Sequence, residues 1–163
     1  MENHGTVREG IITGALGATG VAVWFLIVDT VAGQPFFTPR VLGEGLQSIV
    51  APEATMSAFA IVALYTVFHY AVFFIAGIVI VAIIHGTDKQ PAMLSGVFIL
   101  FIAFEVAFYG YVAMLQLATR LEGIAWYQIG AANFVAAALM GRYLWSMHPE
   151  LTAQFNESLS GRQ

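Results

Sequence analysis

The sequence predicts an all-α integral membrane protein, a four-transmembrane-helix bundle with one or two short interfacial amphipathic helices. Three observations predict this class. Of the 163 residues, 59% are hydrophobic and only 10% are charged, whereas soluble domains carry about 25% charged residues. The mean hydropathy is +0.79. Four continuous apolar segments each reach the ~20 residues that a helix needs to cross the hydrocarbon core, and they lack the polar-apolar alternation typical of barrel strands.

The four predicted spans belong to one membrane domain, residues 1–148. The second and third spans are separated by HGTDKQP, and the third and fourth by TRLEG. The first connection is long and contains three prolines. The spans are expected at about 10–31, 56–84, 91–118 and 123–145.

Two shorter segments are expected at the membrane surface. The first is TPRVLGEGLQSIV, residues 38–50, where a helix is expected to start at Thr38–Pro39. Its apolar side is formed by Val41, Leu42, Leu46, Ile49 and Val50. The second is the C-terminal tail, residues 149–163, whose apolar residues recur four apart. Helices with one apolar side lie in the interface plane rather than across the bilayer.

The flanking basic residues predict an orientation, because cytoplasmic connections carry an excess of Lys and Arg. The side that holds both termini carries Arg8, Lys89, Arg142 and Arg162, and the opposite side carries Arg40 and Arg120. We therefore expect a multi-pass protein of a bacterial inner membrane, with both termini in the cytoplasm.

One ionisable residue interrupts the third predicted span. Glu105 is the only charged residue between Pro91 and Ala118, and at 1.5 Å per residue it lies ~21 Å into the span from the cytoplasmic side. His69 lies ~21 Å into the second span from the other side, so both residues fall near mid-membrane. The sequence leaves two interpretations open: a proton-exchange couple, or a hydrogen bond that fixes the register of two helices.

A faint internal repeat groups two further polar residues with this couple. VAVWFLIVD, which ends at Asp29, aligns with VFILFIAFE, which ends at Glu105. HYAVFFIAG, which starts at His69, aligns with NFVAAALMG, which starts at Asn133. The predicted polar core therefore comprises Glu105, His69, Asn133 and Asp29. Asp29 lies near a helix end, where charge costs little, and we also expect it to form an interfacial pair with Arg40.

Glycines predict where helices pack closely. Gly10, Gly14 and Gly17 share one side of the first span in a G-x-x-x-G pattern, which lets another backbone approach. Gly77 and Gly141 close the two aligned segments and are expected to pack in the same way. The partner is either another helix of the same bundle or a second subunit.

The sequence predicts no cofactor and no metal site. There is no cysteine, and haem bound by two histidines would need a second histidine facing His69 at matching depth. His85 lies on the same predicted span near its end, and His4 and His148 lie in the flanks. A Glu105–His69 metal pair would lack an obvious third ligand.

The function predicted from these residues is a non-enzymatic membrane subunit or scaffold. No complete catalytic set is present, and the net charge of −4 offers no basic surface to nucleic acid. We expect the lipid bilayer as surroundings, and copies of itself or other membrane subunits as partners. Two alternatives stay open: a small proton-linked permease or channel built on Glu105 and His69, and a subunit that holds a cofactor or pigment through His69.

Overall fold

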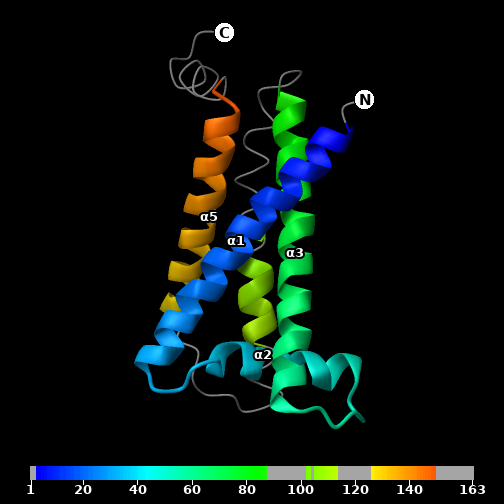
Figure 1. Ribbon diagram of the computed structural model, residues 1–163, viewed down its shortest axis with the longest axis vertical. Helices are drawn as coiled ribbons and strands as arrows, with labels where there is room; N and C mark the ends of the chain where they lie inside the picture. Colours follow the sequence, from blue (N-terminus) through cyan, green and yellow to red (C-terminus); the bar gives the residue numbers. More distant parts are fainter. Residues whose placement is uncertain (1–2, 88–101, 104, 114–125, 150–163) are drawn as a thin grey trace.

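The computed structural model describes residues 3–87, 102–103, 105–113 and 126–149. Within these ranges every regular element is an α-helix and no strand occurs, so the all-α prediction is confirmed. Residues 105–113 form a helical segment of their own. The named helices are α1 (Asn3–Val31), α2 (Phe37–Val50), α3 (Ala58–Thr87) and α5 (Trp126–Met147) (Figure 1).

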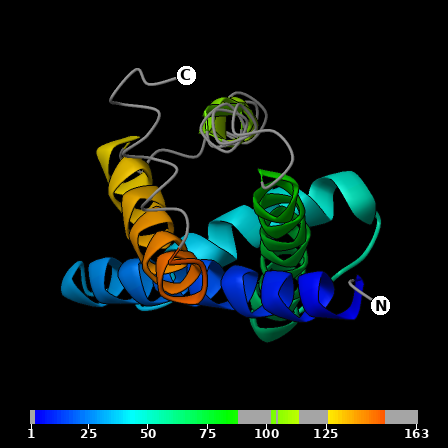
Figure 2. The same cartoon turned by 90° about the horizontal axis from the view of Figure 1, so that it is seen from above.

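Three helices run lengthwise through the molecule, and α2 lies across one end (Figure 1). α1 crosses α3 and α5 obliquely and packs against both, while α2 packs against α3. Seen from above, α3 crosses the line of α1, α5 slants away from it, and the helical segment 105–113 lies farther from α1 (Figure 2). The start of α1 and the final turns of α3 and α5 therefore share the end opposite α2.

Two of the described helices are long and apolar enough to cross a membrane: Gly5–Val31 within α1 and Ala58–Gly86 within α3. The sequence predicted four such spans. α5 is not among the helices that are apolar enough, because Gln128, Asn133 and Arg142 lower its mean hydropathy. The predicted span 91–118 is described only at 102–103 and 105–113, and the predicted tail lies outside the described residues beyond Pro149.

α1 begins well before the apolar run that predicted it. The predicted start was residue 10, whereas the helix starts at Asn3. The polar residues before Gly10 continue the helix. The stretch NHGTVRE contains no proline and only one glycine, which is exposed. Glu9 is consequently a helical residue with a fixed direction, rather than part of a polar flank.

α1 and α3 approach so closely at their crossing that only glycine fits between the backbones. A Cβ on Gly10 would lie 2.5 Å from the Cα of Ile78, and one on Gly14 would meet the carbonyl of Phe73. From the other side, a Cβ on Gly77 would meet the carbonyl of Gly10 and the backbone of Gly14. The glycine groove predicted on the first span is thus filled by a helix of the same chain.

The other two predicted packing glycines have different surroundings. A Cβ on Gly17 would lie 2.5 Å from the Sδ of Met140 on α5 and 2.9 Å from the Phe73 ring on α3. Gly141 has no described atom within 4 Å of its Cβ position, so no described helix approaches it as α3 approaches Gly10, and its packing role stays a prediction. Because Gly77 and Gly141 differ in this way, they give no support to the internal repeat.

α2 occupies the segment predicted to lie at the surface. Val41, Leu42 and Leu46 are buried, as the predicted apolar side requires, whereas Ile49 and Val50 are exposed. The turn before the helix contains two residues with positive φ, Gly33 at 75° and Phe36 at 67°. The turn redirects the chain from α1 into α2.

The largest hydrophobic cluster lies where α1, α2, α3, α5 and the segment 105–113 meet. Each of these elements contributes at least one buried side chain to it. Its buried members are Val21, Phe25, Leu42, Tyr65, Val112, Ile129, Ala132 and Ala136. A smaller cluster of Val81, Ile84 and Leu144 joins α3 to α5 near the opposite end. Hydrophobic packing thus holds the helices together near both ends of the molecule.

Candidate functional site

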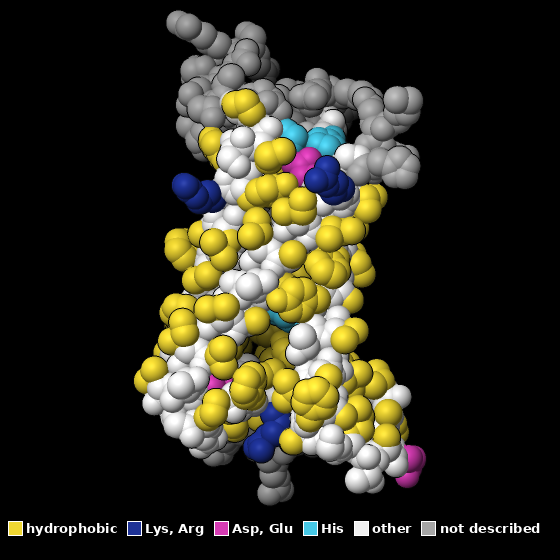
Figure 3. Space-filling view, in the orientation of Figure 1, with side chains coloured by type: hydrophobic (Ala, Val, Ile, Leu, Met, Phe, Trp, Pro, Cys, Tyr) yellow, Lys and Arg dark blue, Asp and Glu magenta, His cyan; other side chains and the backbone are white. Residues whose placement is uncertain are grey.

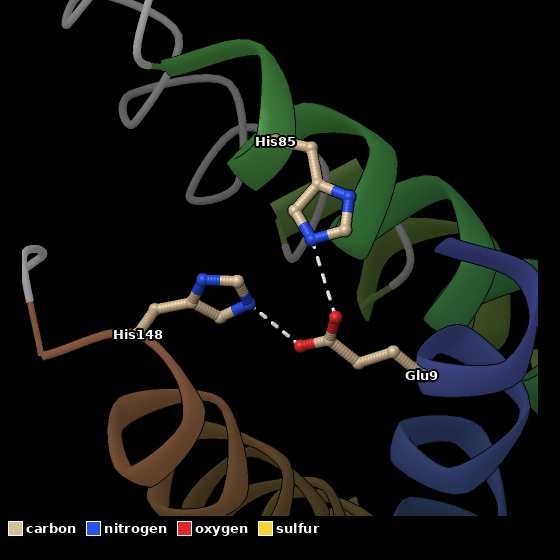
Figure 4. Close-up of side chains that lie close together, drawn as sticks. All are labelled: Glu9, His85 and His148. Carbon is tan, nitrogen blue, oxygen red and sulfur yellow. Dashed lines mark hydrogen bonds and ion pairs between the residues drawn. The ribbon is translucent and has the colours of Figure 1, made fainter. Parts of the chain in front are cut away.

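Three polar side chains from three helices converge at the end of the molecule opposite α2. They are Glu9 of α1, His85 in the last turn of α3, and His148, the residue after α5. The Nε2 atom of His148 lies 2.6 Å from one carboxylate oxygen of Glu9, and the Nε2 atom of His85 lies 3.2 Å from the other (Figure 4). We call these three residues the polar cluster.

Local structure fixes the direction of each member. Glu9 precedes Gly10, the first glycine of the α1–α3 crossing, so the tight approach of the two backbones brings α1 alongside the final turns of α3. The backbone N–H of His148 donates to the carbonyl of Leu144 at 2.9 Å, which continues the helical hydrogen bonding past Met147. Pro149 follows, and it cannot extend that hydrogen-bonding pattern.

The cluster is shielded but can be reached from solvent. The side chains of Glu9 and His148 are each 13% exposed, and that of His85 is 35% exposed. The two imidazole rings have centroids 5.2 Å apart. The Nδ1 atom of His85 lies 2.8 Å from the Oγ1 atom of Thr6, one turn before Glu9 on α1. The side chains of Glu9, His85 and His148 therefore meet at one place, and each can exchange a proton or bind a cation. The Thr6 hydroxyl orients the His85 ring.

The sequence did not single out these residues. His85 and His148 are predicted near a span end and in a flank, and Glu9 lies just before the first predicted span, 10–31. The signal that points to them is topological: an acid and two histidines lie at the three helix ends that share one side of the bundle. Neither composition nor local spacing could indicate this cluster, because His148 is separated from Glu9 by 139 positions.

His69 lies within α3 and contacts α1. Its Nε2–H donates to the backbone carbonyl of Ala18 at 3.0 Å, since a carbonyl can only accept. The ring stacks against Tyr65 at 5.7 Å and lies 4.8 Å from the Phe73 ring. His69 therefore joins two helices by a hydrogen bond, which was the structural interpretation, but with a different partner.

The predicted couple of Glu105 and His69 is not among the described contacts. Glu105 is half-buried in the segment 105–113, and Asn133 is half-buried on α5. The described partners of the His69 ring are Ala18 and its aromatic neighbours. The depth argument that paired Glu105 with His69 used distance along each helix axis and had no information on which side of its helix each residue lies.

Asp29 is buried, with 3% exposure, and it contacts Thr38 rather than Arg40. Its two carboxylate oxygens accept hydrogen bonds from the backbone N–H and the hydroxyl of Thr38, both at 2.8 Å. Arg40 instead pairs with Glu44 at 3.7 Å on the exposed side of α2. The predicted interfacial pair is wrong because the turn after α1 carries Asp29 to the first turn of α2, where orphan N–H groups and the helix dipole favour a carboxylate.

Comparisons of the chain with family models, with curated proteins and with solved structures find no match. The contacts, burial and charge of its own residues are therefore the basis for any functional proposal.

Replacing His69 by phenylalanine is expected to cost little stability. The substitution keeps the ring contacts with Tyr65 and Phe73 and removes the hydrogen bond to Ala18. A typical intramolecular hydrogen bond contributes ~0.5–1.5 kcal/mol net, so we expect the free energy of unfolding to fall by about 1 kcal/mol. A loss well above ~2 kcal/mol would give His69 a larger role than this hydrogen bond.

Proposed function

We propose that the protein is a multi-pass integral membrane protein that acts as a non-enzymatic subunit or scaffold within an oligomer or a larger membrane complex. The proposal includes the two spans of α1 and α3 and two more, formed by the segment 91–118 and by α5. The observation that carries it is the outward-facing apolar surface of α1 and α3.

That surface is too large for the core helices of a soluble protein. Only 33% of the apolar window of α1 and 28% of that of α3 are buried inside the protein. Large apolar side chains face outward along both helices, including Ile27, Val67 and Ile75. Contiguous apolar surface of this kind is stable against lipid or another apolar surface, but not against water.

The distribution of charge supports the same proposal. Residues 10–28 of α1 contain no Asp, Glu, Lys or Arg and rise about 28 Å as a helix, close to the ~30 Å thickness of a hydrocarbon core. α3 contains none of these residues along its whole length. On the visible face, acidic and basic side chains gather toward the two ends, with hydrophobic ones between them (Figure 3).

A groove between α1 and α5 offers a surface for a neighbouring subunit. It has a volume of about 320 Å³ and is lined almost entirely by apolar side chains. Gly20, Trp24 and Leu139 are among its lining residues. In lipid, helices associate by close van der Waals packing, and an apolar groove suits a helix of another subunit. The described contacts of His69 favour neither the proton couple nor the pigment site, so neither is proposed as a function here.

Arginine at position 75 is expected to disturb membrane insertion, whereas arginine at position 49 is not. Both Ile75 on α3 and Ile49 on α2 are 64% exposed, so the two substitutions differ in place and not in burial. Arginine in the middle of a span costs ~2.5–3.5 kcal/mol, and at the interface it costs little. We expect the fraction that resists alkaline extraction from membranes to fall by about half or more for I75R.

Two outcomes would count against the membrane proposal. One is a wild-type chain that leaves the membrane fraction on alkaline extraction, and the other is equal extraction of I75R and I49R. The subunit role is tested separately by crosslinking in native membranes. A defined oligomer or a reproducible membrane partner supports it, and a lone monomer in native membranes and at all detergent concentrations contradicts it.

A further inference from the structure

We propose that Glu9, His85 and His148 form a binding site for a divalent transition-metal ion of the Zn²⁺ type. The inference goes beyond the subunit role and does not depend on it. Its basis is the polar cluster, in which one carboxylate and two imidazoles from α1, α3 and the end of α5 present their ligand atoms within 4.8 Å of one another.

The donor types select the class of ion. Imidazole nitrogen suits Zn²⁺ and its neighbours Co²⁺, Ni²⁺ and Cu²⁺, whereas Mg²⁺ and Ca²⁺ prefer sites made of oxygen ligands. The cluster offers two imidazole nitrogens and a single carboxylate. Two histidines and a glutamate also form a known three-ligand set for zinc, with the fourth position open to water or another ligand. The described residues thus match an ion with an accessible coordination position.

The geometry is close to what such an ion requires. With metal-ligand distances of ~2.0–2.2 Å, neighbouring ligand atoms in a tetrahedral site lie about 3.3–3.6 Å apart. The His85 Nε2 atom is already 3.2 Å from its Glu9 oxygen. The His148 Nε2 atom, at 2.6 Å from the other oxygen, must move outward by several tenths of an ångström. Both rings present Nε2 toward the carboxylate (Figure 4), and the ligand atoms lie within 4.8 Å of one another, so the three side chains have to draw closer together to hold one ion.

Thr6 provides a hydrogen-bond partner for the second ring nitrogen of His85. The histidine ligands of metal sites almost always use their other ring nitrogen to donate to an oxygen, which fixes the ring and the tautomer. The Nδ1 atom of His85 lies 2.8 Å from the Thr6 hydroxyl. When Nδ1–H donates to that hydroxyl, the Nε2 lone pair points toward Glu9 and is free to bind the ion. Without an ion, the same hydroxyl can donate to Nδ1 while Nε2–H donates to the carboxylate.

Position and burial also suit an ion site. The ligands come from α1, α3 and the end of α5, and the glycine crossing and the packing of α5 on α1 place these three helices relative to one another. Glu9 and His148 are mostly shielded, while His85 is exposed enough to admit an ion. Histidine and acidic side chains are visible together at this end of the molecule (Figure 3). A rigid site with an open entrance favours binding over transient contact.

The test uses the full chain without a histidine tag, purified in detergent, stripped with a chelator and titrated with Co²⁺ alone. Tetrahedral Co²⁺ absorbs visibly through its d–d bands. We expect a saturable signal at one ion per chain, which Zn²⁺ displaces. H85A and H148A should each weaken binding by more than about 100-fold, because losing a ligand exceeds the 10–100-fold effect of losing an outer partner. H69F, which removes a histidine outside the cluster, should bind as wild type.

Substitutions at Thr6 distinguish the orientation of the His85 ring from direct binding of the ion. T6V should weaken Co²⁺ binding by about 10-fold, and T6S, which keeps the hydroxyl, should restore it. An experiment on the wild-type chain covers variants that fail to fold: Zn²⁺ should protect His85 and His148 from acylation by diethyl pyrocarbonate, read by peptide mass spectrometry. Three results would overturn the proposal. They are the absence of stoichiometric Co²⁺ binding, Co²⁺ binding in folded H85A and H148A equal to that of wild type, and acylation of His85 and His148 that Zn²⁺ does not change.

Discussion

Alanine at position 77 is expected to destabilise the bundle strongly. The added Cβ would meet the carbonyl of Gly10 and the backbone of Gly14, and backbone cannot rotate away as a flexible side chain can. α1 and α3 must therefore separate along their closest contact. Overpacking of a tight interior typically costs 1–3 kcal/mol, and we expect about 3 kcal/mol here. In a thermal melt in mild detergent, followed by circular dichroism, this corresponds to a midpoint lower by roughly 10 °C.

The matched control is G141A on α5. Gly141 is also helical, but no described atom lies within 4 Å of its Cβ position. Alanine is the better helix former by ~1 kcal/mol, so G141A should unfold at the same temperature as wild type or slightly higher. Equal midpoints for G77A and G141A would mean that the α1–α3 crossing is looser than the backbone contacts imply.

Alanine at position 29 is expected to have the second large effect. Asp29 accepts two hydrogen bonds from Thr38 at 2.8 Å while 3% exposed. Hydrogen bonds to charged groups contribute ~1.5–3 kcal/mol, and a buried donor left without a partner adds its own cost. We expect D29A to lower the free energy of unfolding by about 3 kcal/mol. Local opening should be largest in α2, which hydrogen-deuterium exchange of its first turn would report.

Two variants separate this interaction from the pair that the sequence predicted. D29N keeps an oxygen for the Thr38 N–H and loses the charge that favours the helix N-terminus, so an intermediate loss is expected. R40A removes an exposed pair with Glu44, and exposed pairs contribute ~0.2–1 kcal/mol at most. A loss in R40A as large as that in D29A would restore the Asp29–Arg40 pairing and contradict the contact with Thr38.

The helical class and several helix positions could be predicted because they follow from composition and local pattern. α3 has almost no residue that interrupts its apolar run, and the buried Leu42 and Leu46 of α2 lie four residues apart, as on one side of a helix. The glycine groove was also predictable, since a G-x-x-x-G pattern is local. Its partner was not, because the pattern does not say whether a helix of the same chain or another subunit fills it.

The site could not be predicted, for a physical reason. Glu9, His85 and His148 are brought together by three helix directions and two packing contacts, none of which is local in sequence. Glu105 and His69 were paired by depth alone, and depth leaves the rotation of each helix undetermined. Asp29 was paired with Arg40 by nearness in sequence, whereas the tight turn at Gly33 and Phe36 presents Thr38 to it first.

The order of the three contributing helices along the chain bears on how the protein is made. α1 and α3 and their glycine crossing are complete within the first 87 residues, and a chain emerges from the ribosome from its N-terminus onward. These two helices can pair while the rest is still being synthesised. His148 arrives last, and only its arrival joins the end of α5 to Glu9 and His85. The polar cluster therefore closes only after α5 has been made, and a chain that stops short of position 148 cannot complete it.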